Sequence, residues 1–171
     1  MITKKGLSQV VSTVILIALT IVLVGGTFTL VRNYVTKSLD DTSACNNILE
    51  KISLNKDYTC FDSKTNSTLI SISRNEFVLD SLLVSVAYEE RGTTFYLSDI
   101  PTNIQNLTYY GDLISTEVQI PGNESGKTYC LSGTYPAPSR IEIAPKRSGK
   151  QCNIVDSIQD IPTCAPDLTC S

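Results

Sequence analysis

The feature that most constrains this chain is an uninterrupted apolar stretch near its start. From Val10 to Val31, twenty-two residues carry no charged side chain. As an α-helix rising about 1.5 Å per residue, the stretch would extend about 33 Å, enough to cross a hydrocarbon core of about 30 Å. A helix that is apolar on every face must be surrounded by lipid or by other apolar helices. We therefore expect a membrane-length helix at the N-terminal end of the chain.

The charges around this stretch suggest how it is oriented. Lys4 and Lys5 precede it, which favours a cytoplasmic N-terminus and an external location for everything after the helix. Arg32 and Lys37 follow it, so positive charge flanks both ends. The distribution of cysteines supports the same orientation independently.

All six cysteines follow the apolar stretch. An even number on one side of a membrane-length segment indicates disulfides formed outside the cytoplasm. Reduced, buried thiols are the alternative, and zinc is disfavoured because no Cys-x2-Cys spacing occurs. The sequence does not choose among the pairings; a Cys164–Cys170 bridge and a bridge from the C-terminal tail to Cys45 are two candidates. The disulfide candidates are Cys45, Cys60, Cys130, Cys152, Cys164 and Cys170.

The composition excludes several classes of function. Histidine is absent, which excludes Ser-His-Asp and Cys-His nucleophiles and His-ligated metals. The net charge of −3 argues against a nucleic-acid partner, which needs a concentrated basic surface. The acidic residues are scattered, and no calcium-loop motif occurs. We therefore expect no catalytic, cofactor or metal site, and a protein that is not an enzyme.

The residues just before the apolar stretch are more specific than a membrane anchor needs. A secretory signal peptide has a shorter apolar region followed by a small-residue cleavage site, and neither is present. The segment from Lys4 to Val11 reads K-K-G-L-S-Q-V-V. It resembles the class III signal peptide of archaeal type IV pilins, and the run from Ser12 to Gly26 is similar to the start of their mature chains. The resemblance implies that a prepilin peptidase cuts between Gly6 and Leu7, so residues 1–6 are removed and the helix is retained.

Two details place the resemblance within the wider family. Bacterial type IV pilins carry a glutamate at the fifth mature position, where this chain has Val11, so an archaeal type is implied. Archaellins, the subunits of the motility filament, usually begin with a glycine-rich segment, whereas residues 9–13 read Q-V-V-S-T. The resemblance therefore implies an adhesion-type pilin. Its partners would be copies of itself, the membrane before assembly, and an assembly ATPase with its membrane platform.

Gly25 and Gly26 lie within the apolar stretch and admit two interpretations. They would let neighbouring helices approach closely, as small residues do in membrane helix pairs. Alternatively, they are local weak points that are tolerated because lipid strongly favours helix.

The rest of the chain predicts a small β-rich domain. Residues 7–40 are expected to form the helix and an amphipathic stem that ends at Asp40–Ser43, and residues 44–171 a head domain. Alternating apolar residues in the head predict short antiparallel strands in a sandwich or small barrel, with overall class α+β. A short helical start near Asn46–Ile52 is a further expectation. The expected strands are 68–73, 83–88, 94–97, 116–120, 127–131, 140–144 and 151–155.

Three N-x-[ST] sequons occur in the head, at Asn66, Asn106 and Asn123. They fall at expected turns or strand ends, where an oligosaccharide has room, so we treat all three as candidates for N-glycosylation.

Three hypotheses about function remain. The first is a pilin located in the cell membrane as a precursor and then in an extracellular surface filament. The second is a membrane-tethered head that binds a sugar or protein as a monomer and never polymerises. The third is an archaellin. A pilin-like protein of low abundance lies between the first two, and the sequence does not distinguish a major from a minor subunit.

Overall fold

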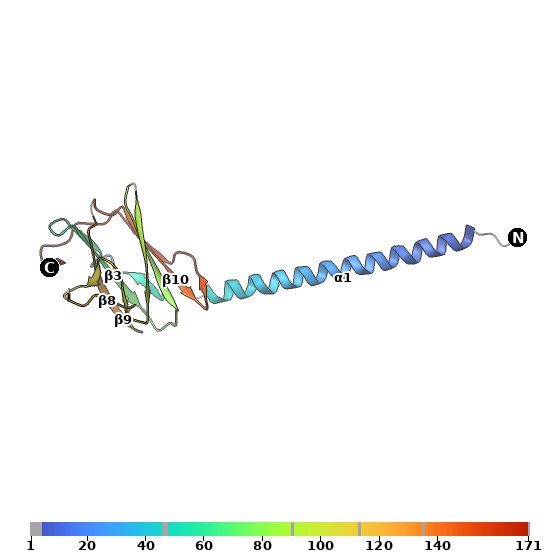
Figure 1. Cartoon of the computed structure of the whole chain (residues 1–171), viewed down its shortest axis with the longest axis horizontal. Helices are drawn as coiled ribbons and strands as arrows, with labels where there is room; N and C mark the ends of the chain where they lie inside the picture. The colour runs from blue at the N-terminus through green and yellow to red at the C-terminus, as the bar shows by residue number, and fades with distance from the viewer. Residues whose placement is uncertain (1–4, 46–47, 90, 113, 135, 171) are drawn as a thin grey trace. The chain divides into compact units, whose positions relative to one another are not determined.

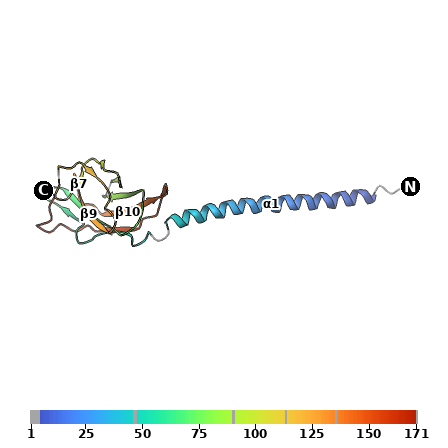
Figure 2. The ribbon, with the colours of Figure 1, turned by 90° about the horizontal axis from the view of Figure 1, so that it is seen from below.

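The computed structural model describes residues 5–45, 48–89, 91–112, 114–134 and 136–170. The chain divides into two compact units, Met1–Ser43 and Ala44–Ser171. We call the second the head unit. Figures 1 and 2 show the helix of the first unit and the sheets of the second from two directions.

The described part of the first unit lies within one helix, α1, which runs from Lys5 to Cys45. Its apolar part, Val11–Thr36, has a mean hydropathy of 2.6 over the most apolar window. The helix continues past Asp40–Ser43, where we expected the chain to leave it. The physical reason is that residues 40–45 contain neither proline nor glycine, the residues that usually end a helix.

The head unit contains two five-stranded antiparallel sheets and a two-stranded one, so the α+β class is confirmed. The first sheet has the order β1-β3-β9-β7, with β2 also paired to β3. The second has the order β11-β10-β4-β5, with β12 also paired to β10, and the third pairs β6 with β8. The strands are β1 (Ile52–Leu54), β2 (Cys60–Asp62), β3 (Ser67–Arg74), β4 (Ser81–Ala87), β5 (Gly92–Ser98), β6 (Thr102–Asn103), β7 (Leu107–Tyr109), β8 (Glu117–Val118), β9 (Ser125–Ser132), β10 (Arg140–Arg147), β11 (Lys150–Gln151) and β12 (Asp156–Gln159).

The two large sheets pack face to face around one apolar core. Because side chains alternate between the faces of a strand, every second residue points inward. Ile70 and Ile72 of β3 meet Val84 of β4 and Ile143 of β10 in this core, and all four are fully buried. The core gives the head a sandwich architecture.

The alternation of apolar residues located most of these strands. The strands expected at 68–73 and 83–88 and the hairpin into 94–97 are confirmed as β3, β4 and β5. The segments at 116–120 and 127–131 do contain strands, but β8 pairs with β6 and β9 pairs with β3 and β7. The alternation of apolar residues shows which face of a strand is buried, but not which strands lie beside it. The pairing of these strands could therefore not be predicted from it.

Three expectations about the head were wrong in detail. β10 extends through Pro145, where we expected a turn. Of residues 151–155 only Gln151 is in a strand, so Cys152 does not lie on one. No helical start is present in the described part of Asn46–Ile52, because residues 49–51 form a turn and Ile52 begins β1; Asn46 and Asn47 lie outside the described residues.

Three disulfides connect the six cysteines, in a pattern that differs from both candidates. Cys45, the last residue of α1, is bonded to Cys152. Cys60 is bonded to Cys164, and Cys130 to Cys170. The C-terminal tail is therefore joined to β2 and β9 of the first sheet, and not to itself or to Cys45.

This tail covers the outer face of the first sheet. The amide of Phe61 donates to the carbonyl of Pro162 at 2.8 Å, and the amide of Cys164 donates to the carbonyl of Phe61 at 2.9 Å. Beneath the tail, Leu69 and Cys130 are fully buried. Both faces of β3 are thus buried, one by the second sheet and one by the tail.

Candidate functional sites

The apolar surface of α1 is the most extensive candidate site in the chain. Every residue from Val11 to Thr36 is exposed, including large side chains such as Leu30, which is 72% exposed. Soluble proteins rarely expose contiguous apolar surface on this scale, because its contact with water is unfavourable. The helix is therefore suited to lipid or to other apolar helices, which indicates a membrane or secreted location.

The threonines of α1 satisfy their own hydroxyl groups. Thr20 donates to the carbonyl of Ile17 at 2.8 Å, and Thr27 to that of Leu23 at 2.9 Å. Thr29 and Thr36 make equivalent bonds to carbonyls three or four residues earlier. A hydroxyl without a partner is costly in an apolar environment, and back-bonding to the helix removes most of that cost. These polar side chains are therefore compatible with an environment that offers no water.

No contact within the described part of the chain explains why glycine occurs at positions 25 and 26. A Cβ atom built at either position meets nothing within 4 Å. The helix is continuous through both residues, so they do not act as a break. If these glycines serve packing, the partner is another molecule.

The expected processing site lies at the start of α1. Gly6 and Leu7 are in its first turns, and Lys5 is its first residue. Lys4 lies outside the described residues.

All three candidate glycosylation sites are exposed and lie in turns. Asn66 precedes β3, Asn106 precedes β7 and Asn123 precedes β9. Asn66 and Asn106 have positive φ values of 50° and 63°, a conformation that asparagine tolerates better than most residues. The turns alone therefore account for asparagine at these two positions.

The sequons fall at opposite ends of the first sheet. Antiparallel pairing places the start of β3 beside Ser132 and the start of β7 beside Leu131, so Asn66 and Asn106 lie at one end. Asn123 lies at the other end, before Ser125.

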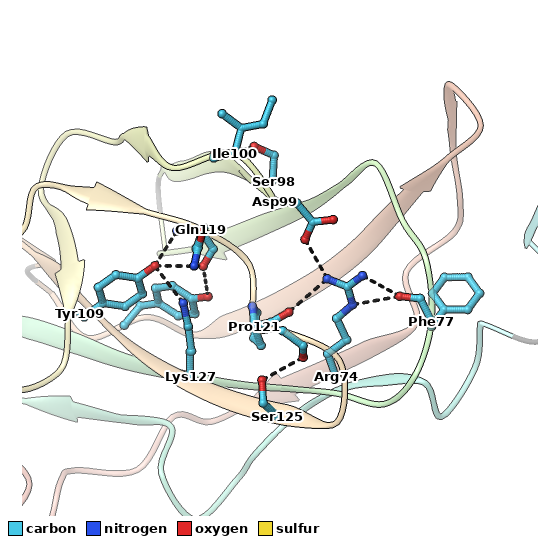
Figure 3. Close-up of polar contacts among 12 residues, drawn as sticks. Arg74, Phe77, Ser98, Asp99, Ile100, Tyr109, Gln119, Pro121, Ser125 and Lys127 are labelled. Atoms are coloured by element: carbon cyan, nitrogen blue, oxygen red, sulfur yellow. Dashed lines mark hydrogen bonds and ion pairs between the residues drawn. The ribbon is translucent and has the colours of Figure 1, made fainter.

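A buried arginine links three segments of the head (Figure 3). The guanidinium of Arg74, which is only 5% exposed, donates to the carbonyls of Phe77 and Pro121. It also forms an ion pair with Asp99 at 2.9 Å, whose own side chain is largely exposed. Because its donors are occupied by protein atoms, we assign Arg74 a structural role. This role could not be predicted from the sequence, because an arginine at the end of a strand is equally typical of a solvated side chain.

A second polar cluster gathers around the backbone of Gln119 (Figure 3). The amide of Gln119 donates to the hydroxyl of Tyr109 at 2.7 Å, and its carbonyl accepts from the hydroxyl of Tyr129 at 2.7 Å. The ammonium group of Lys127 lies 4.6 Å from the ring centre of Tyr109. Burial, with a smaller contribution from Tyr109, raises the pKa of Tyr129 far above its usual value. Tyr129 therefore stays neutral and acts as a fixed hydrogen-bond donor.

A shallow polar groove lies where the β4–β5 turn approaches the ends of β7 and β9. It has a volume of about 210 Å³ and is lined by Tyr88, Arg91, Asn106 and Thr134, among others. Burial raises the pKa of Tyr88 while the charge of Arg91 opposes that shift. The volume is below the range of about 300–1,000 Å³ usual for small-molecule sites.

The described residues contain no group of three or more His, Cys, Asp or Glu side chains arranged to hold a metal. Comparisons with protein-family models, with characterised proteins and with solved structures found no match to this chain.

Proposed function

We propose that this chain is the precursor of an adhesion-type archaeal type IV pilin, a structural subunit that polymerises through α1 into a surface filament. The observation that carries the proposal is the apolar surface of α1, which is exposed throughout Val11–Thr36 and contains no unsatisfied threonine hydroxyl at positions 20, 27, 29 and 36. A chain that used this helix only as an anchor would need the same length and hydropathy. The K-K-G-L motif at the start of the helix favours the pilin over the anchor.

Assembly would move α1 from one apolar environment into another. Before assembly, α1 is surrounded by lipid; in the filament, it is surrounded by other copies of α1. Because both environments are apolar, the transfer changes the hydrophobic free energy little, and packing between helices decides the outcome. Prepilin peptidase would remove residues 1–6, and the assembly ATPase with its platform would extract the subunit from the membrane.

The head unit would form the outer, exposed part of such a filament. Three disulfides connect it, which fits an oxidising, extracellular environment. The exposed turns at Asn66, Asn106 and Asn123 would accept N-linked glycans. The mass of tryptic peptides that contain these residues, before and after release of N-glycans, tests this part of the proposal.

The proposal is tested by replacing Gly6 in an archaeal host that has a prepilin peptidase. We expect Gly6→Val to block cleavage, so the protein accumulates in the membrane and disappears from the filament fraction sheared from the cells. Thr3→Val is the matched control, because it alters the same leader and leaves the K-K-G-L motif intact. Filaments that persist in Gly6→Val cells would contradict the proposal.

The alternative is a membrane-tethered binding module, for which the polar groove beside Tyr88 and Arg91 is the supporting observation. A tether predicts that the protein reaches the surface equally in wild-type and Gly6→Val cells and forms no sheared filament in either.

A further inference from the structure

One strand edge of the head unit is open in a way that the other edges are not. The edge strands of the two large sheets are short, except β5: β1, β2 and β7 have three residues each, β11 two and β12 four, whereas β5 has seven. Two of the short edges also have partners outside the sheet. The amide of Leu54 in β1 donates to Asp156, and β2 is bonded to the tail through Phe61. The edge of β5 is therefore the longest of these, although its last residue, Ser98, already accepts a hydrogen bond from the amide of Ile120.

The hydrogen bonds around β5 establish which of its residues face the open side. At the β4–β5 turn, the carbonyl of Arg91 accepts from the amide of Tyr88, so Arg91 faces β4. At the other end, the carbonyl of Ser98 accepts from the amide of Ile120, so Ser98 faces away from β4. Because backbone groups alternate sides along a strand, Gly92, Thr94 and Tyr96 also face away from β4.

These three residues are unpaired on that side. Within the part of the chain that the structure describes, the N–H and C=O groups of Gly92, Thr94 and Tyr96 have no hydrogen-bond partner in the chain. Gly92 is exposed, and the side chains of Thr94 and Tyr96 are exposed on the outer face of the second sheet, with Tyr96 56% exposed.

The strand also lacks the features that normally prevent pairing at an edge. Natural edges are protected by charged residues, proline, bulges or covering segments. β5 reads G-T-T-F-Y-L-S, with no charge and no proline, and it pairs with β4 without a bulge. Its threonine and aromatic residues are those that favour strand pairing.

We propose that this edge is an interface between two copies of the chain, in which β5 pairs antiparallel with β5 of a second molecule. The net charge of the head limits where two copies of it can approach each other. Residues 44–171 contain ten basic and fifteen acidic residues, so two heads repel each other overall. An uncharged strand is where they can approach without placing like charges opposite each other.

The residues of β5 are self-complementary in one register. A two-fold axis at Thr94 places Thr94 opposite Thr94, and Tyr96 opposite Gly92. In antiparallel pairing these become hydrogen-bonded pairs, because the three residues are those whose backbone groups face outward. The ring of Tyr96 would then cover the partner's Gly92, an arrangement by which an aromatic residue compensates for glycine in a strand. The paired second sheets would form one continuous sheet across the two heads.

This inference concerns the head alone and does not depend on the filament proposal. In a filament this two-fold pairing would join heads of different filaments, and in a tethered protein it would form dimers at the surface.

Cysteine crosslinking of the full-length chain in detergent micelles tests the register. All six native cysteines are bonded, so one added cysteine is the only free thiol. In a hydrogen-bonded antiparallel pair the Cα atoms are about 5.5 Å apart, within the range of about 4.4–6.8 Å for a disulfide. We expect Thr94→Cys to form a covalent dimer under mild oxidation. Thr93→Cys, also exposed and on the same strand, should not, because Thr93 is opposite Phe95 in this register.

Sedimentation of the full-length chain in micelles separates β5 pairing from association through α1. Thr94→Lys places two like charges on the two-fold axis and replaces an exposed side chain whose hydroxyl makes no hydrogen bond within the described residues. We expect it to weaken the dimer at least about tenfold and to leave the melting temperature unchanged. A wild-type chain that stays monomeric, a dimer that Thr94→Lys does not weaken, or equal crosslinking at Thr93 and Thr94 would each overturn the inference.

Discussion

Arg74 fixes the end of β3 to two separate loops of the head. Its guanidinium donates to the carbonyls of Phe77 and Pro121, which have no other donor among the residues that the structure describes, and pairs with Asp99. Its burial is possible because its charge is satisfied on several sides at once.

We expect Arg74→Met to lower the free energy of unfolding by about 2–4 kcal/mol, because it leaves buried carbonyls without donors. Asp99→Asn is the control. Its side chain is 61% exposed, so the loss of that ion pair should cost less than about 1 kcal/mol. Urea unfolding with the disulfides intact measures both, and equal losses would contradict the account of Arg74.

The ionisation of Asp62 is expected to make the stability of the head and its attached tail depend on pH. Burial raises the pKa of its carboxyl group, but hydrogen bonds from the Thr65 hydroxyl and from the amides of Lys64, Thr65 and Cys170 outweigh burial, so the pKa lies below its usual value of 3.8. A carboxylate with a lowered pKa stabilises the fold above its unfolded-state pKa, and this contribution is lost as pH falls through the folded-state pKa.

We therefore expect Asp62→Asn to be less stable than the wild type at pH 7. The difference should shrink as pH falls below about 4, where the wild-type carboxyl group also becomes neutral. Thermal unfolding of both proteins from pH 7 to pH 2 measures this, and a difference that stays constant with pH would exclude the proposed role.

At the scale of the elements, the C-terminal tail is held on the head mainly by disulfide bonds, and only to a small extent by strand pairing. It contains Pro162 and Pro166 and forms no paired strand of its own beyond an isolated bridge from Thr163 to Phe61. Its position on the first sheet depends on Cys164 and Cys170.

Replacing Cys130 and Cys170 together by alanine should lower the free energy of unfolding by about 2–4 kcal/mol. It should also let carboxypeptidase digest the chain back toward Cys164. The double variant Cys45→Ala/Cys152→Ala is the control, because it removes a different disulfide and leaves the tail attached. Equal protection of the tail in the two variants would show that the Cys130–Cys170 bond is not what holds it.

The glycines of α1 give a prediction about assembly. Gly25→Leu adds a side chain where the chain itself leaves open space, so membrane insertion should be unchanged. If neighbouring helices approach closely there, the yield of sheared filaments should fall about tenfold or more relative to the membrane pool. Val31→Leu, at a position that is 59% exposed, adds bulk roughly 120° around the helix from Gly25 and serves as the control. Equal yields from the two variants would show that Gly25 has no role in packing.

The sequence predicted elements better than it predicted their connections. β4 was predictable because its alternation requires only that one face be buried, and β3 because Ile70 and Ile72 alternate with serines even though the tail also buries its other face. The pairing of β8 with β6, and the bond of Cys130 to Cys170, were not, because both depend on which segments meet in three dimensions. The open edge of β5 could not be predicted either, because an edge is defined by the absence of a neighbouring strand.

At the scale of the whole molecule, two units of different chemistry are joined in one chain. The helix exposes apolar surface that water disfavours, and the head has its own core and its own disulfides. The proposed pilin function depends on processing at the start of the helix, where Gly6 precedes Leu7.

The most direct test of the central claim is the N-terminal residue of the protein recovered from its native cell surface, by intact mass and terminal peptide sequencing. The pilin account predicts a mature chain that starts at Leu7. A chain that retains residues 2–6 while present at the surface would contradict it, and would favour a membrane-tethered head.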